Sequence, residues 1–468
     1  MKHSLRLAAF LSTLVLPGIA LAQNAPLVPL DSTPIALTDA AGKPYFPPTR
    51  VEYNGIAQQT QDNLQRQILA KWFPAAVNRE QGGFDQNFAA DWAKLPGTER
   101  SIVYQSRLTW TAAQAAMRLP REEFIYRNYA RHGVDFLRDT MWDAQDGGFY
   151  WQVDNGVADR NGEKHVYGNA FAIYALSAAY QATKNPDALR LAQQDFFWLE
   201  KHAHDDQNKG YFEALKRDGT PIMTPPSPEQ LGDFIGTRYG YKSMNTHIHL
   251  LEAYGALYEI WPDARLKMRL NELFELVRDR IYVEPGVLNQ FFTPDWRPIP
   301  AEDSYGHDIE TAYLLTEAAH ILGRENDPKA RRAARSLVDH SLDVAFDKEL
   351  GGLANDGGTF GNIVNPDKVW WSQAEALNAM LLMHELYGTG PDADPRYWEA
   401  FVKQWNFIRQ YQIDPVNGGW YSYVKADGTP PPATQVKSDR WTESYHQGRA
   451  MMNVTETLRR LASGETRK

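Results

Sequence analysis

The stretch GGFYWQVDNG, residues 147–156, joins two glycines to a run of aromatic residues and a turn signal. This pattern is typical of a β-hairpin. Variants of it recur along the chain, and the first glycines of successive copies lie 65, 63, 76, 65 and 67 residues apart. The six copies are GGFDQNF (82–88), GGFYWQV (147–153), KGYFEAL (209–215), PGVLNQFF (285–292), LGGLAND (350–356) and GGWYSYV (418–424). A fixed period of this length predicts one unit, two helices and a hairpin, repeated six times.

Each hairpin signal is followed by a segment that we expect to be an inner helix. Residues 170–180 and 376–387 are apolar nearly all round, as in helices packed on several sides, whereas 126–142 and 266–282 are apolar on one side only. The pattern predicts an all-α fold, an (α/α)6 barrel of twelve helices with short β-hairpins where the inner helices begin. A superhelical solenoid is the alternative. The six inner helices are expected to open with QSRLTW (105–110), HVYGNAF (165–171), NTHIHLLEAY (245–254), GHDIETAYLL (306–315), WWSQAEAL (370–377) and SYHQGRAMM (444–452).

Residues 1–22 have the pattern of a signal peptide. Lys2 and Arg6 give a positive start, residues 7–16 form an apolar stretch, and Ala20-Leu21-Ala22 makes a small-residue cleavage site. The apolar stretch is too short to span a bilayer as a mature helix. We therefore expect cleavage after Ala22 and a mature protein in a bacterial periplasm or outside the cell.

The rest of the chain divides into two parts. Residues 23–50 are rich in Pro and Ala and have little periodicity, which predicts a tether or strap, and residues 51–468 are expected to form one catalytic barrel. Loss of the signal peptide removes two basic side chains and no acidic one, so the net charge changes from −9 to −11. That sign argues against nucleic acid and anionic membrane surfaces as partners. With no cysteine, the fold depends on its core rather than on disulfides.

Polar residues useful to acid–base chemistry gather in the opening turns of the expected inner helices. His307 and Glu310 are three residues apart and share one helix face, as do His446 and Arg449. If the inner helices run parallel, their N-termini create a positive potential at one end of the barrel, which suits a reaction that develops an oxyanion. The other candidates in these opening turns are Arg107 and His249 for catalysis and Asn245, Trp371 and Glu375 for substrate binding. Arg449 is also expected to bind the substrate.

A metal site built from His249, His307, Glu310 and His446 is a weaker hypothesis, because no local motif has chelating spacing. The pair His247-x-His249 points its two rings to different sides of a helix. Nucleophilic catalysis is weaker still, since there is no cysteine and no serine in an elbow motif. We expect no metal and no cofactor.

Aromatic residues cluster at the same helix starts and suit the apolar faces of a pyranose. Tyr167, Trp371 and Trp441 are the expected sugar contacts. The third repeat is longer than the others because of TPPSPEQLGDFIGTRYGY, residues 224–241, and this insertion is expected to overhang the pocket. The expected partner is therefore a small sugar with a reducing end.

At these motifs the chain resembles the N-acylglucosamine 2-epimerase superfamily and, within it, the cellobiose 2-epimerases. GHDIE, WWSQAE, NTHIHLLEA, QSRLTW and W-x4-H-x2-R match the family's patterns in order. The resemblance covers nearly everything after Val51 and implies an (α/α)6 barrel. It also implies that His307 and His446 act as general base and general acid. By the same matching it gives Arg107, Tyr167, His249, Glu310, Trp371 and Trp441 to the site.

Two positions depart from the family's pattern. Tyr313 replaces a usual tryptophan, and Thr442-Glu443-Ser444 replaces the usual approach to a Pro-Tyr-His. Both are expected to line the far end of the substrate, so they bear on which sugar is bound. The sequence does not distinguish a free hexose, an N-acylated hexosamine and a β-linked disaccharide as the substrate.

The resemblance implies inversion of C2 of a reducing sugar through an enediolate, with one histidine serving each face. Each histidine is expected to have a pKa near the working pH. Protonation at C1 instead would make the same pocket an aldose–ketose isomerase. A glycoside hydrolase on the same barrel is a further alternative and would use two carboxylates from among Asp308, Glu310, Glu375 and Asp233. A non-catalytic sugar-binding protein would keep the tryptophans but has no need of the two histidines.

Overall fold

A computed structural model describes residues 32–38, 42, 45–159 and 162–465. The expected signal peptide and the first part of the expected tether lie outside the described residues. The described part of the tether includes a contact with the outside of the fold, where the backbone of Ile35 and the side chain of Asn406 exchange hydrogen bonds of 2.9 and 3.0 Å. None of the described helices has the length and apolar character needed to cross a bilayer.

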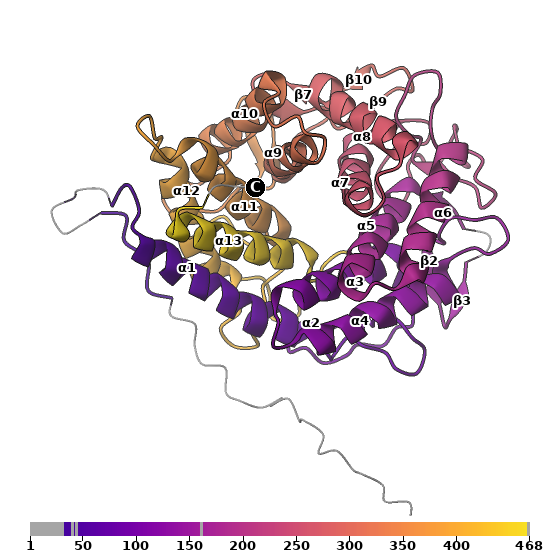
Figure 1. Cartoon of the computed structure of the whole chain (residues 1–468), viewed down its shortest axis with the longest axis horizontal. Coiled ribbons are helices and arrows are strands. Elements are labelled where there is room, and N and C mark those ends of the chain that lie inside the picture. Colours follow the sequence, from indigo (N-terminus) through magenta and orange to yellow (C-terminus); the bar gives the residue numbers. More distant parts are fainter. Residues whose placement is uncertain (1–31, 39–41, 43–44, 160–161, 466–468) are drawn as a thin grey trace, which may run out of the picture. The chain divides into compact units, whose positions relative to one another are not determined.

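In the described part of the chain, twelve helices of three or more turns alternate between an inner and an outer ring (Figure 1). The inner helices are α3 (Ile102–Arg118), α5 (Val166–Thr183), α7 (Met244–Ile260), α9 (Tyr305–Ile321), α11 (Trp370–Tyr387) and α13 (Tyr445–Ser463). The outer helices are α1 (Arg50–Asn63), α4 (Glu123–Phe136), α6 (Pro186–His202), α8 (Ala264–Leu276), α10 (Pro328–Val344) and α12 (Arg396–Phe407). The short helix α2 (Ala70–Trp72) and the π-helical turns η1 (Leu64–Leu69), η2 (Leu137–Met141), η3 (Val277–Ile281) and η4 (Ile408–Gln412) extend four of the outer helices.

The inner ring is closed. Each inner helix contacts the next one along the chain, and α13 contacts both α11 and α3. The seam is covered by α1, the first of the described helices, which packs against α13, the last of them; Thr60 and Thr455 share a buried hydrogen bond of 2.7 Å there. The predicted (α/α)6 barrel is thus confirmed, and the solenoid alternative does not hold because a solenoid has two free ends.

Short antiparallel strands form small sheets at the end of the barrel where the inner helices begin. The strand before each of the first five inner helices pairs with a strand of the next repeat, for example β1 with β2 through Arg100 and Val153. The strands are β1 (Arg100–Ser101), β2 (Gln152–Asp154), β3 (Val157–Ala158), β4 (Lys164–His165), β5 (Ala214–Leu215), β6 (Lys242–Ser243), β7 (Tyr282–Val283), β8 (Val287–Leu288), β9 (Phe291–Phe292), β10 (Pro298–Ile299), β11 (Asp303–Ser304), β12 (Asp356–Gly357), β13 (Ile363–Asn365), β14 (Lys368–Val369) and β15 (Tyr423–Val424).

The glycines of the repeated motif lie in the turn of a hairpin. In the second repeat the Asp143 carboxylate accepts hydrogen bonds from the backbone amides of Gln145 and Asp146, and Gly147 and Gly148 follow at φ 74° and 72°. Left-handed backbone of this kind favours glycine, because a side chain would clash there. Asn78, Asp205, Asp347 and Asp414 accept backbone amides in the same way at the other copies, and only the fourth copy departs from this design.

Candidate active site

One polar residue in each of the first five inner helices anchors the hairpin of its own repeat. Gln105, for example, bonds both the amide and the carbonyl of Phe84, each at 2.7 Å. The residues equivalent to Gln105 are Asn169, His247, Asp308 and Gln373. His247 is therefore a structural anchor: it accepts the Tyr211 amide at 2.9 Å, and its other ring nitrogen contacts the Ser243 carbonyl at 2.7 Å.

The anchor fixes the rotation of each helix, so equivalent positions face the barrel axis. Two residues after the anchor come Arg107, Phe171, His249, Glu310 and Glu375, and Arg449 holds the same position after Gln447 in the sixth helix. The six repeats thus carry different side chains at the same helix position, and these side chains face the barrel axis.

A cavity of about 270 Å³ opens at the N-terminal end of the inner helices. Nine of the residues named from the sequence line it or lie in its wall. The lining consists of Arg107, Tyr167, Ile235, Asn245, His249, His307, Glu310, Trp370, Trp371, Trp441 and His446. Ile235 belongs to the insertion at residues 224–241, which therefore reaches the pocket as expected.

His307 and His446 face this cavity from α9 and α13. Trp371 lies between them, with its ring centroid 4.7 Å from that of His307 and 5.6 Å from that of His446. Burial lowers the pKa of His307 to about 4 and, together with Arg107 and Arg449, holds the pKa of His446 well below its ordinary value. Both imidazoles are therefore neutral near pH 7, which differs from the expectation of pKa values near the working pH.

Each of these histidines has one nitrogen held by a neighbour. Nδ1 of His307 is hydrogen bonded to Oγ of Ser304 at 2.7 Å, and Nδ1 of His446 to Oε1 of Glu375 at 2.8 Å. Nε2 is then the nitrogen available to a ligand in both rings. Burial raises the pKa of Glu375 to about 8, so this carboxyl group holds a proton near neutral pH.

Arg449 lies behind the pocket wall, at the centre of a buried group of carboxylates. Its Nη2 donates to Oε1 of Glu310 at 2.5 Å and to Oε1 of Glu375 at 2.7 Å, and its Nη1 donates to Glu252. Burial raises the pKa of Glu252, but Arg449, His249 and Tyr445 together outweigh burial and lower that pKa to about 2. Arg449 and Glu375, which we expected to bind substrate, do not line the pocket; they support residues that do.

Glu252 was not singled out from the sequence. It accepts hydrogen bonds from the Tyr445 hydroxyl at 2.7 and 2.8 Å and lies 3.2 Å from Nδ1 of His249. It thereby holds His249 with Nε2 free. The spacing His249-x2-Glu252 on one helix face was the signal that could have identified it.

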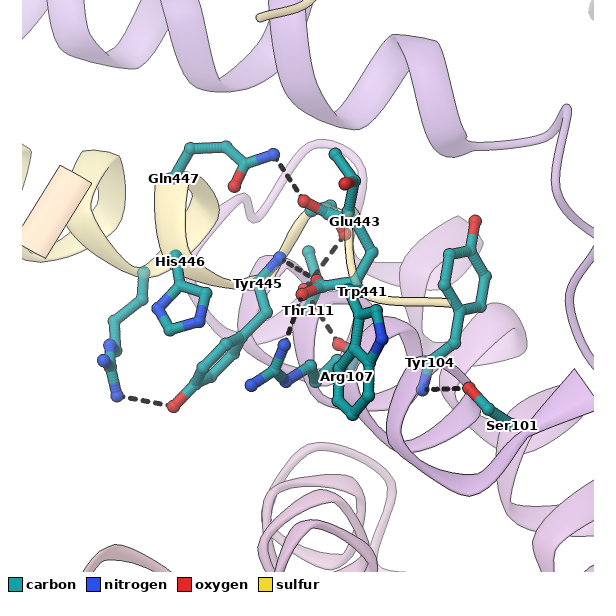
Figure 2. Close-up of polar contacts among 12 residues, drawn as sticks. Ser101, Tyr104, Arg107, Thr111, Trp441, Glu443, Tyr445, His446 and Gln447 are labelled. Carbon is teal, nitrogen blue, oxygen red and sulfur yellow. Dashed lines mark hydrogen bonds and ion pairs between the residues drawn. The ribbon is translucent and has the colours of Figure 1, made fainter. Parts of the chain in front are cut away.

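Arg107 is held on two sides. Its Nη1 donates to Oε1 of Glu443 at 3.0 Å (Figure 2). Its Nη2 donates to the Tyr167 hydroxyl at 3.0 Å, and its guanidinium lies 4.2 Å from the Phe171 ring. Burial raises the pKa of Glu443, and the charge of Arg107 opposes that rise. Glu443 belongs to the segment Thr442-Glu443-Ser444, which we expected to line the far end of the substrate; it instead lies buried behind the pocket wall as the partner of Arg107.

The metal hypothesis is not favoured by the geometry. Glu310, Glu375 and His446 do converge closely enough to hold an ion. The guanidinium of Arg449, however, already lies against both carboxylates and supplies the positive charge that an ion would bring.

Tyr313 lies at the opposite end of the barrel from the substrate pocket. It lines a cavity of about 780 Å³ formed by the C-terminal halves of inner helices. Our expectation that it lines the far end of the substrate is therefore wrong. Its position in the middle of α9, two turns from the helix start, separates it from the pocket at the helix N-termini.

Comparison with known proteins shows the family to which the chain belongs. The pattern of the N-acylglucosamine 2-epimerase (GlcNAc 2-epimerase) family matches residues 82–450. The chain belongs to this family. The cellobiose 2-epimerase of Bacteroides fragilis is 32% identical over 412 residues, which cover 85% of this chain and 98% of that protein.

Two further relatives of this N-acylglucosamine 2-epimerase family member bear on its function. The D-mannose isomerase of Marinomonas mediterranea is 26% identical over 411 residues, 83% of this chain and 95% of that protein. The structure of cellobiose 2-epimerase from Bacillus thermoamylovorans superposes with a TM-score of 0.77 at 28% identity, over 86% of this chain and 99% of that one. The chain is thus an enzyme of the sugar epimerase and isomerase type.

Proposed function

We propose that this enzyme inverts C2 of a reducing sugar, with His307 and His446 serving opposite faces of the sugar. The observation that carries the proposal is the placement of two neutral imidazoles on separate helices of one sugar-sized pocket, on either side of Trp371. A neutral imidazole can accept a proton from carbon, and two of them can serve two faces.

In one direction, Nε2 of His307 takes the proton from C2 and an enediolate forms. His446 then gives the Nε2 proton to the opposite face of C2, while Nδ1 takes a proton from Glu375. The protonated Glu375 makes this donation possible, because a neutral imidazole alone is a poor acid. The ring ends neutral, with Glu375 ionised, and His307 ends as the imidazolium. The reverse direction begins from this state. Nε2 of His446 takes the C2 proton while its Nδ1 returns a proton to Glu375, and the imidazolium of His307 then protonates the opposite face.

The enediolate carries negative charge that the pocket must stabilise. Arg107 lines the pocket and supplies hydrogen-bond donors, and the N-termini of the inner helices add a positive potential. His249 also lines the pocket; because its Nδ1 donates to Glu252, its Nε2 is an acceptor for a sugar hydroxyl. The aromatic wall formed by Tyr167, Trp371 and Trp441 suits pyranose faces, and Asn245 offers an amide to a hydroxyl group. The proposed substrate is a neutral mono- or disaccharide with a free reducing end.

Aldose–ketose isomerisation is the second candidate, because the Marinomonas relative is a D-mannose isomerase. The same enediolate would then be protonated at C1. A hydrolase is not favoured. It would need two carboxylates in the pocket, and only Glu310 of the four considered for this role lines it.

The test is incubation of the purified enzyme with a panel of reducing sugars, followed by NMR and mass spectrometry. Glucose, N-acetylglucosamine and cellobiose represent the three substrate classes. We expect a C2 epimer of unchanged mass from at least one of them. A ketose as the main product would favour isomerisation, and a shortened oligosaccharide would contradict both.

We also propose that the enzyme works in a periplasm or outside the cell after cleavage following Ala22. The support is the signal-peptide pattern of residues 1–22. Expression of the full chain in a Gram-negative host, with N-terminal sequencing of the periplasmic protein, tests it. A mature chain that begins at Gln23 is expected, and uncleaved protein in the cytoplasm would contradict it.

A further inference from the structure

The proposed function leaves one buried charge unexplained, the carboxylate of Glu443. This side chain is fully buried, although it lies in the loop just before α13. One of its oxygens accepts the Nη1–H of Arg107 at 3.0 Å, and the other accepts the backbone N–H of Tyr445 at 2.5 Å. Burying a carboxylate is costly unless it is paired in this way.

An arginine and a backbone amide at a helix N-terminus, the two partners of Glu443, are groups that bind anions in proteins. Tyr445 is the first residue of α13, so its amide is one of the unpaired donors at a helix N-terminus. Arg107 is the only lysine or arginine among the described residues that line the pocket. A phosphate group entering the pocket would seek the same arginine and the same kind of amide.

We propose that Glu443, which lies buried behind the pocket wall, takes the two donors that an anion in the pocket would need and thereby selects neutral sugars over phosphorylated ones, while it positions Arg107. This inference rests on the proposed function for its substrate class. The Glu443 carboxylate balances the charge of Arg107 and takes the Tyr445 amide, so an incoming phosphate meets like charge instead of free donors. The same pair joins α3 to α13 across the seam of the ring and fixes Arg107 relative to His446 (Figure 2).

The experiment measures binding without turnover. Inorganic phosphate and glucose 6-phosphate are titrated against the wild type and Glu443→Gln at constant ionic strength, by calorimetry and by fluorescence of the tryptophans that line the pocket. We expect Glu443→Gln to bind both probes about tenfold more tightly or better, since one repelling charge within a few ångströms is removed. Equal affinities in the two proteins would overturn the proposal.

Two variants separate charge from other effects. Glu443→Asp keeps the charge, so it should bind phosphate as weakly as the wild type. Glu385→Gln is the matched control, because Glu385 forms a comparable pair with Arg460 at the opposite end of α13; it should leave phosphate affinity unchanged. A gain of phosphate binding in either variant would contradict the charge argument.

Positioning of Arg107 has its own readout. Glu443→Gln and Glu443→Asp should each lower kcat on a neutral sugar about ten- to a hundredfold, because a displaced Arg107 no longer contacts the enediolate. A wild-type kcat in both would remove the positioning role.

Neutral variants of a buried pair can fail to fold, so circular dichroism is recorded first and Glu443→Ser is the second choice. The wild type alone also tests the idea: if it binds glucose 6-phosphate more tightly than glucose, the proposal is wrong. If no sugar is epimerised and the binding shifts still appear, the proposed function fails and the role of Glu443 stands.

Discussion

Oε1 of Glu375 lies 2.8 Å from Nδ1 of His446, and both side chains are buried. Glu375 comes from α11 and His446 from α13, so the contact joins two neighbouring inner helices. Burial raises the pKa of the carboxyl group and lowers that of the ring. The pair therefore holds one proton on the carboxyl side near neutral pH, and this proton is the one that the proposed acid step requires.

This relationship predicts the pH dependence of kcat/KM. His307 must be neutral to accept a proton, so activity should rise as pH increases through about 4. Glu375 must be protonated to supply one, so activity should fall as pH increases through about 8. Initial rates measured between these limits and beyond them check the bell shape.

The variant Glu375→Gln tests the assignment of the upper limb. It should remove that limb and lower kcat by about 10²–10⁴-fold, since the amide has no proton to relay. Glu385→Gln serves as the control and should keep both limbs. An unchanged fall above about pH 8 in Glu375→Gln would assign that limb to another group.

The two histidines should be separable by exchange experiments. His307→Asn and His446→Asn are each expected to lose epimerisation by several orders of magnitude, because a positioned acid or base contributes about 10²–10⁴-fold and both steps need one. Each variant can still exchange the C2 proton of the epimer that its remaining histidine deprotonates, with retention of configuration. Near-wild-type epimerisation by either variant would take that histidine out of the mechanism and leave Glu310 or His249 as candidates.

Removal of metal ions should leave activity intact. Arg449 supplies positive charge to Glu310 and Glu375, where an ion could otherwise sit. Exhaustive treatment with EDTA followed by gel filtration and assay on the true substrate checks this. A loss of activity that zinc or manganese restores would make these carboxylates and His446 a metal site.

Closure of the ring predicts that its last helix is indispensable to cooperative unfolding. A chain that ends at Ser444 lacks α13, so both α11 and α3 lose their neighbour at the seam. We expect this truncation to abolish the cooperative thermal transition, whereas a chain that ends at Gly464 should keep it. Independent melting steps in the truncated protein would indicate several separately stable units.

The repeat period predicted six helix pairs and favoured a closed barrel, but it did not exclude a solenoid; the contact between α13 and α3 decides between the two. The same register placed Arg107, His249, His307 and His446 at helix starts, and the structure brings them into one pocket. The pairing of α1 with α13 follows from the closure, not from any local pattern.

Other features depend on contacts between helices far apart in sequence. Whether Glu375 and Arg449 face the sugar or lie behind the wall is decided by side chains from α7 and α9 that surround them. The expectation that Tyr313 contacts the substrate was wrong for a simpler reason: this residue lies two turns beyond the start of α9. Glu443 precedes its helix, so helical spacing gives no indication that it pairs with Arg107.

The central claim is that protons leave and return at C2 through two histidines. It is tested most directly by turnover of the true substrate in D2O, stopped at low conversion and analysed by NMR. The account predicts deuterium at C2 of the epimer and protium at C2 of the remaining substrate. An epimer that retains protium at C2, or deuterium found at C1 of a ketose, would contradict it.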